Sequence, residues 1–195
     1  MRALTTARLA LEPVTVENAA ALLRVMQAAH LREFQDVPRY TREEFERRVA
    51  QRPKRLHARA IGRFEWLILP RGGSSPVGWV SLRLGDHAPG VAEIGYSLIY
   101  AHRRRGYAFE ACVAVVGAAF GTSDIARVEA CCVPENAPSR RLLERLGFAE
   151  IKQQRNGAVV RGRAVDIIVY QLAREAWAQA GSANSIATSA TPKPK

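Results

Sequence analysis

Residues 93–108, EIGYSLIYAHRRRGYA, constrain the fold more than any other part of the chain. Their pattern predicts a short strand that runs directly into an arginine-rich turn, followed by an apolar helix. The first amides of a helix lack partners within the helix and carry partial positive charge, so they can hold an anion. Gly106 and Ala108 let the backbone approach a phosphate closely, and Arg103–Arg105 add full charges. The segment therefore predicts a phosphate site at the start of a helix.

The remaining patterns predict an α+β (mixed α/β) fold. Strands are expected at residues 7–14, 64–69, 77–84, 91–99, 127–133, 148–154 and 164–172, and helices at 16–29, from Thr41 onward, at 106–120 and at 136–146. Thr41 and Glu44 form a capping box, while RGGSS and Asn156-Gly157 predict turns. The helix at 106–120 is apolar or small almost all round, so it should be buried on most sides.

Length and composition favour one domain. A chain of 195 residues with 48% hydrophobic composition can bury one full core. We expect that domain to cover residues 1–177, because residues 178–195 are rich in Ala, Ser, Thr, Gly and Pro and predict a disordered tail. The longest apolar run, Ala111–Phe120, is too short to span a bilayer, so no membrane association is expected.

Net charge and cysteine content indicate which partners and which cell compartment to expect. A formal charge of +11 favours anionic partners, such as nucleotide phosphates, acidic proteins or RNA, although a genome that favours arginine explains it equally well. The three cysteines, with no signal peptide, favour a reducing cytoplasm. Cys131 and Cys132 are neighbours on an expected strand and should point to opposite faces. No Cys/His spacing suits a metal, so none is expected.

Two motifs together indicate a family. The turn has the form Arg-x-x-Gly-x-Ala, and it is followed further on by Asn136-Ala-Pro-Ser139 and Leu-Leu-Glu-Arg-Leu-Gly147-Phe148. This combination resembles the acyl-CoA site of the GNAT N-acetyltransferase superfamily, most closely its RimJ/RimL branch, which acetylates protein N-termini and various small amines. The resemblance implies the GNAT fold, a mostly antiparallel mixed sheet flanked by helices. It also implies acetyl-CoA as the acyl donor and a primary amine as the acceptor.

The resemblance assigns the donor site residue by residue. In the family this turn wraps the pyrophosphate of CoA, and the preceding strand lies along the pantetheine and polarises the thioester carbonyl. The Asn of the second motif contacts the pantetheine. The positions that match are Arg103, Arg104, Arg105, Gly106, Tyr107 and Ala108 in the turn, Leu98 and Ile99 in the strand, and Asn136. From the residues alone, Asn136 is equally well explained as a helix N-cap.

Two further residues are candidates for catalysis. Strand alternation places Glu93 on the face of Gly95 and Ser97, and the resemblance makes it the general base. An amine needs one, because an ammonium has no lone pair. The alternative is that Glu93 only pairs with an arginine. The resemblance places Ser139 near the sulfur, where it protonates the leaving thiolate. Many GNAT enzymes use a tyrosine for that step, but the matching position here is Leu143.

Several alternatives stay open at this stage. The preferred acceptor is a protein N-terminal α-amino group, of the kind found on ribosomal proteins, and a small-molecule amine is the second choice. In the family the acceptor pocket is framed by segments that match residues 30–40 and 155–163. A catalytically inactive CoA-binding module is one other function, and a basic RNA- or ribosome-binding protein is another. The chain has no interleaved aromatic-basic stripe, so we expect nucleic-acid contact only through a ribosomal acceptor. A homodimer is left open.

Overall fold

The computed structural model describes residues 1–28, 33–57, 59–85, 88–122 and 124–180. Eight strands form one sheet in the order β1-β2-β3-β4-β5-β6-β8-β7, and only the β5–β6 pair is parallel. The strands are β1 (Leu4–Thr5), β2 (Leu9–Pro13), β3 (Gly62–Pro70), β4 (Gly78–Leu84), β5 (Val91–Leu98), β6 (Arg127–Cys132), β7 (Ala149–Val160) and β8 (Arg163–Ala173). The expected α+β class with a mostly antiparallel mixed sheet is confirmed.

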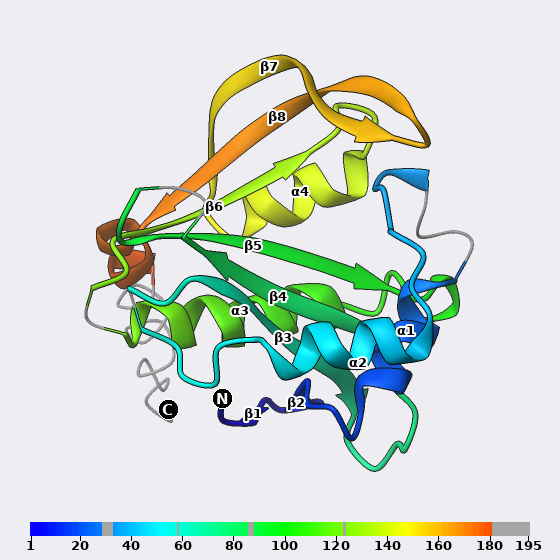
Figure 1. Cartoon of the computed structure of the whole chain (residues 1–195). Coiled ribbons are helices and arrows are strands. Elements are labelled where there is room, and N and C mark those ends of the chain that lie inside the picture. Colours follow the sequence, from blue (N-terminus) through cyan, green and yellow to red (C-terminus); the bar gives the residue numbers. More distant parts are fainter. Residues whose placement is uncertain (29–32, 58, 86–87, 123, 181–195) are drawn as a thin grey trace, which may run out of the picture.

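The sheet opens between its two central strands. Residues Val91–Glu93 of β5 pair with residues Arg127–Glu129 of β6, and the pairing ends there although β5 continues to Leu98. Figure 1 shows the two strands diverging beyond this short ladder. We call this divergence the β5–β6 opening. After Glu93, the backbone N–H and C=O groups of β5 that face the opening do not pair with β6. They can therefore form hydrogen bonds with a bound molecule or with side chains.

Helices cover both faces of the sheet. Helices α1 (Ala19–Met26) and α2 (Arg42–Ala50) pack on one face, around a cluster that includes Leu67 and Trp79. Helices α3 (Tyr107–Phe120) and α4 (Ala137–Arg145) lie on the other face, over the main core. None of the helices formed by the described residues is long and apolar enough to cross a membrane.

Helix α3 is the central helix of the core, as its composition predicts. No residue from Tyr107 to Phe120 is exposed, and six are buried. Residues 174–180 form a further helical segment, in which the Trp177 ring lies 6.2 Å from the ring of Phe120. This segment runs past the expected domain boundary at residue 177. The rest of the expected tail, residues 181–195, lies outside the described residues.

The structure confirms the predicted capping box and contradicts one predicted turn. The Thr41 and Glu44 capping box is formed at the start of α2. The expected turn at Asn156-Gly157 is wrong, because β7 runs through it as an irregularity in the pairing with β8. Asn156 adopts the left-handed conformation (φ 51°), which asparagine tolerates in a bulge as well as in a turn. The chain reverses instead at Arg161-Gly162, and both of these residues also have positive φ.

Candidate active site

The predicted phosphate turn lies at the end of β5. After Leu98 the chain forms a short 3₁₀ turn, η2 (Tyr100–His102), and then bends sharply into α3. Two left-handed residues make this bend: Arg104 has φ 60° and Gly106, the N-cap of α3, has φ 78°. No side chain caps the helix, so its first amides are not satisfied by a local side chain. This is the arrangement of a helix N-terminus that can accept an anion.

The three arginines of the turn take different directions. Arg104 and Arg105 are exposed. Arg103 folds back along β5, where its Nε donates to the carbonyl of Leu98 at 3.4 Å and its guanidinium lies 5.5 Å from the Tyr100 ring centre. The turn therefore presents two solvent-facing guanidinium groups beside the uncapped helix end, which suits a pyrophosphate.

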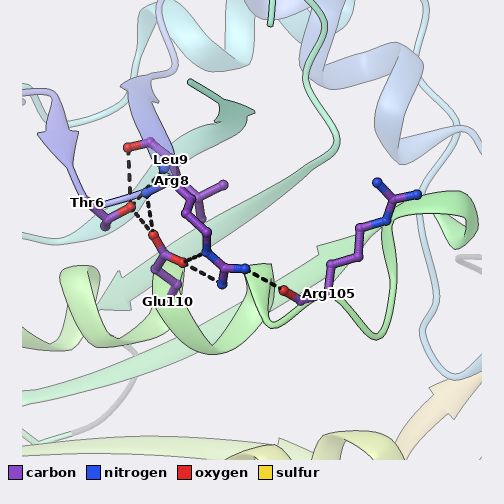
Figure 2. A network of polar contacts seen from close by, with 5 residues as sticks. All are labelled: Thr6, Arg8, Leu9, Arg105 and Glu110. Carbon is purple, nitrogen blue, oxygen red and sulfur yellow. Dashed lines mark hydrogen bonds and ion pairs between the residues drawn. The ribbon is translucent and has the colours of Figure 1, made fainter. Parts of the chain in front are cut away.

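A polar network holds the turn from the side of the N-terminal hairpin (Figure 2). Glu110, in the first turn of α3, accepts hydrogen bonds from the Thr6 hydroxyl (2.5 Å) and the Arg8 backbone amide (2.8 Å). Its other oxygen pairs with Nε and Nη2 of Arg8 at 2.7 and 2.6 Å. The remaining arm of that guanidinium donates from Nη1 to the carbonyl of Arg105 at 2.9 Å. One arginine thus joins β1–β2, helix α3 and the backbone of the turn.

The two predicted backbone donors at the end of β5 differ in their partners. Ile99 donates its amide to the carbonyl of Val77 at 2.8 Å, so that amide is already used. Peptide groups alternate in direction along a strand, so the amide of Leu98 faces away from β4 and toward the β5–β6 opening. Leu98 is therefore the donor that can face a thioester carbonyl.

Glu93 lies where the β5–β6 opening begins. It is the last residue of β5 that pairs with β6, opposite Glu129. Its carboxylate accepts a hydrogen bond from Nη2 of Arg83 at 2.9 Å, and 23% of its side chain is exposed. The arginine partner considered from the sequence is thus present, and the carboxylate still reaches solvent.

Ser139 lies at the start of α4 and is held from two sides. Asn136 caps the helix and accepts the Ser139 amide on its side-chain oxygen at 3.2 Å. The Ser139 hydroxyl lies 2.8 Å from the phenol oxygen of Tyr96. Burial raises the pKa of the Tyr96 phenol, which therefore stays protonated at physiological pH. Burial also raises the pKa of the Cys132 thiol, and a hydrogen bond with Ser139 partly offsets this.

Tyr96 is the site residue that the sequence analysis missed. Alternation along β5 did indicate that it shares a face with Ile94 and Leu98, away from Glu93. Nothing in the sequence indicated that this face meets the start of α4. Tyr100 and Tyr107, the other tyrosines near the turn, contact arginine side chains instead: Arg103 and Arg8 lie 5.5 and 5.2 Å from their ring centres.

Glu93 and Ser139 lie on opposite faces of the sheet. Odd-numbered residues of β5, such as Glu93 and Ser97, point to the face covered by α1 and α2. Even-numbered residues, such as Ile94 and Tyr96, point to the face covered by α3 and α4. A group that lay in the β5–β6 opening would therefore have a carboxylate on one side and a hydroxyl on the other.

The two segments expected to frame an acceptor pocket pack against one shared cluster, to which the second segment contributes Ala158 and Val160. Gln35, from the segment between α1 and α2, donates to the Ser97 hydroxyl at 2.8 Å. Its neighbour Phe34 packs against a small cluster formed by Val133, Ile167 and Val169. The expected 155–163 loop is the turn end of the β7–β8 hairpin. Part of the expected 30–40 segment, residues 30–32, lies outside the described residues.

Within the described residues no group of three or more His, Cys, Asp or Glu side chains is placed to hold a metal ion. The cysteines are free thiols, with Cys131 exposed and Cys132 buried, as strand alternation predicts. The groups that border the β5–β6 opening include a backbone donor, one carboxylate and one hydroxyl, which suit transfer between organic groups.

Comparison with known proteins finds acetyltransferases. The chain matches the family model for an acetyltransferase (GNAT) domain over residues 8–149. It is 27% identical over 179 residues to p20 of Bacillus licheniformis, an uncharacterized N-acetyltransferase, which covers 91% of this chain and 99% of that protein. It is 33% identical over 100 residues to YdaF of Bacillus subtilis, which carries the provisional name of a ribosomal N-acetyltransferase; the match spans 51% of this chain and 55% of YdaF.

Solved structures show the same fold. RimL, a ribosomal L7/L12 alpha-N-protein acetyltransferase solved in complex with coenzyme A, superposes with a TM-score of 0.77 at 20% identity, over 90% of this chain and 99% of RimL. A GCN5-related N-acetyltransferase from Brucella melitensis superposes with a TM-score of 0.71 at 26% identity, over 93% of this chain and 84% of that protein. The match to RimL shows the fold alone.

Proposed function

The chain belongs to the GNAT acetyltransferase family and is an N-acetyltransferase, and from that premise we propose that it transfers the acetyl group of acetyl-CoA to the α-amino group of a protein N-terminus. The observation that carries this proposal is the placement of Glu93 and Ser139 on opposite faces of the sheet at the β5–β6 opening. The thioester supplies the activated acyl group, and the residues around the opening bind it and move the protons.

The donor would be held at two places. Backbone amides of residues 104–108 and the exposed guanidinium groups of Arg104 and Arg105 would bind the pyrophosphate at the uncapped end of α3. The amide of Leu98 would bind the thioester carbonyl within the opening. A donor aimed at a carbonyl oxygen that gains charge stabilises the transition state more than the ground state. Asn136, which caps α4, would lie beside the pantetheine.

Glu93 would accept the proton of the incoming amine. The amine nitrogen bonds to the carbonyl carbon while its proton passes to the Glu93 carboxylate, directly or through a water molecule. Arg83 fixes the orientation of that carboxylate through the 2.9 Å hydrogen bond. An α-amino group has a pKa of about 7.7–8.0, against about 10.4 for lysine, so a useful fraction of it is neutral at physiological pH. A single carboxylate base therefore suffices for an α-amino acceptor.

Ser139 would protonate the leaving thiolate on the other face. The carbon–sulfur bond breaks as the nitrogen–carbon bond forms, and the Ser139 hydroxyl gives its proton to the departing sulfur. Solvent then returns a proton to Ser139 and takes up the amine proton from Glu93, so that both residues are restored. Tyr96 supports this role because its phenol can donate to the Ser139 oxygen at 2.8 Å, which leaves the serine proton free to point at sulfur.

The proposal is tested with Glu93→Gln, which keeps the size of the side chain but removes the proton acceptor. We expect kcat to fall about 100-fold, a CoA affinity within twofold of wild type, and partial recovery of the rate as pH rises. The matched control is Glu129→Gln, because Glu129 lies opposite on β6 and is also paired with an arginine, Arg127, at 3.0 Å. We expect this control to keep the wild-type rate.

The acceptor is tested with peptides that carry a free or a blocked N-terminus, with and without a lysine, together with a set of small amines. Mass spectrometry should find acetyl only on free N-termini. Acetylation of small amines alone would replace the proposed acceptor class. A folded protein that binds CoA but turns over none of these amines would favour the inactive CoA-binding module. A Glu93→Gln variant with wild-type rate and pH profile would make Glu93 a structural residue.

A further inference from the structure

Arg8 is separated from the turn by almost a hundred residues, yet its guanidinium reaches the turn's backbone. It lies in the bend between β1 and β2, and Nη1 donates to the carbonyl of Arg105 at 2.9 Å. The same guanidinium lies against the next residue, because a Cβ added to Gly106 would be 3.1 Å from Nη2. Its carbon is 5.2 Å from the ring centre of Tyr107. Three successive residues of the turn thus meet one side chain.

The contact with the Arg105 carbonyl also determines where the next amide points. In a planar trans peptide the C=O and the following N–H point in opposite directions. The carbonyl of Arg105 faces Arg8, so the amide of Gly106 faces away from Arg8. Glycine allows this peptide to turn over easily, because it accepts both signs of φ. The reversed peptide would present a carbonyl oxygen to an anion, in place of an amide.

Glu110 holds Arg8 in this position. The carboxylate binds Nε and Nη2 of Arg8, at 2.7 and 2.6 Å, so only the third arm of the guanidinium is directed at the turn. Glu110 is itself fixed by the Thr6 hydroxyl and the Arg8 amide. A carboxylate in the first turn of α3 would by itself repel a phosphate at that helix end. Its pairing with Arg8 offsets this charge.

We propose that Arg8, held by Glu110, is a positioning residue that keeps the Arg105–Gly106 peptide oriented with its amide toward the pyrophosphate. This inference rests on the proposed use of the turn for acetyl-CoA. It gives the N-terminal hairpin a role in donor binding although neither Arg8 nor Glu110 belongs to the turn. Arg8 lies away from the reacting atoms, so its effect should appear in donor binding and not in the chemical step.

The main test compares Arg8→Ala with wild type by calorimetry with CoA and by steady-state kinetics. We expect the Kd for CoA and the KM for acetyl-CoA to rise about tenfold, the usual cost of losing one well-placed hydrogen bond to a charged group, with kcat unchanged at saturation. Acetylpantetheine lacks the pyrophosphate, so the variant should use it as well as wild type does. Arg8→Lys keeps the charge but not the fork, and it should resemble Arg8→Ala.

Glu110→Gln separates positioning from simple electrostatics. Removing a negative charge beside a phosphate should tighten CoA binding if only charge matters. If Glu110 holds Arg8 in place, the same change should weaken binding, by about threefold to fivefold. The matched controls are Arg42→Ala and Glu46→Gln on α2, an exposed pair at 2.6 Å that changes the net charge identically. They should leave the Kd within twofold.

The outcomes distinguish this inference from the proposed function. A wild-type protein that binds no CoA would overturn both. Wild-type binding that is unchanged in Arg8→Ala, or tightened in Glu110→Gln, would overturn the positioning role alone. An equal loss with acetylpantetheine would also overturn it, because the effect would then not act through the pyrophosphate. Melting temperatures within a few degrees of wild type, with retained kcat, are required for the Arg8 variants to support it.

Discussion

The N-termini of α3 and α4 both lie beside the β5–β6 opening, but only the N-terminus of α4 is capped by a side chain. The N-cap of α3 is Gly106, in a left-handed conformation and without a side-chain hydrogen bond to the helix. The N-cap of α4 is Asn136, whose side-chain oxygen accepts a hydrogen bond from the amide of Ser139. The first helix end leaves its amides for a ligand, and the second satisfies its own. The open end suits an anion, whereas the closed end holds one side chain, Ser139, in place.

The substitution with the largest expected effect is Gly106→Val, at the uncapped N-terminus of α3. A β-branched residue is strained at φ 78°, and its Cβ would lie 3.1 Å from the Arg8 guanidinium. We expect the added side chain to clash with the pyrophosphate, so that CoA affinity falls by well over about tenfold in calorimetry while the protein still folds. Gly72→Val is the control, since Gly72 has φ 79° and nothing within 4 Å of an added Cβ. Unchanged CoA affinity in folded Gly106→Val would remove the turn from the donor site.

At the closed end, Ser139→Ala tests whether the capped helix presents a proton donor. We expect kcat to fall about tenfold with little change in the KM for acetyl-CoA. This is less than the usual effect of a general acid, because a thiol with a pKa of about 8.5 leaves readily even without protonation. Tyr96→Phe should cost about threefold, because it removes only the phenol that contacts Ser139. A raised KM with unchanged kcat in Ser139→Ala would assign Ser139 to binding instead.

Substitutions of Asn136 test how much the N-cap of α4 contributes to the stability of the protein. Asn136→Ala should lower the free energy of unfolding by about 1 kcal/mol in urea titrations, the usual cost of losing an N-cap. Asn136→Asp keeps the capping oxygen, so it should retain most of that stability. If the aspartate variant is stable but binds CoA more weakly, the amide nitrogen of Asn136 contacts the pantetheine. Equal stability of all three proteins would mean that the cap contributes nothing measurable.

The smallest effect expected is the acid dependence of the Arg8–Glu110 pair. Desolvation raises the pKa of Glu110, but hydrogen bonds from Thr6 and Arg8 together outweigh it and hold the pKa below its ordinary value of 4.5. Because the folded pKa is lowered, this stabilisation is present above pH 4.5 and is lost as pH falls through the folded pKa. The melting temperature of wild type should exceed that of Glu110→Gln by a constant amount from pH 8 to 5. The difference should shrink below pH 4.5, and a difference that persists there would exclude the ion pair as its source.

The sequence predicted the local pieces of this site because each depends on neighbours in the chain. The strand–turn–helix unit, the cap at Asn136 and the alternation of Glu93 against Tyr96 follow from spacing alone. The family resemblance then supplied their roles. The Asn156-Gly157 turn failed because left-handed residues serve turns and bulges alike, and only the pairing of β7 with β8 distinguishes the two.

The sequence by itself therefore determined the class of fold, the open helix end at Gly106 and the residues of the turn. The tertiary structure decided which distant groups meet them. It brought Arg8 to the Arg105 carbonyl, Tyr96 to Ser139, and Arg83 to Glu93. It also placed the two candidate catalytic groups on opposite faces of the sheet. These contacts depend on the strand order and on the divergence of β5 from β6. Both are determined by packing of the whole core, so no short stretch of sequence predicts them.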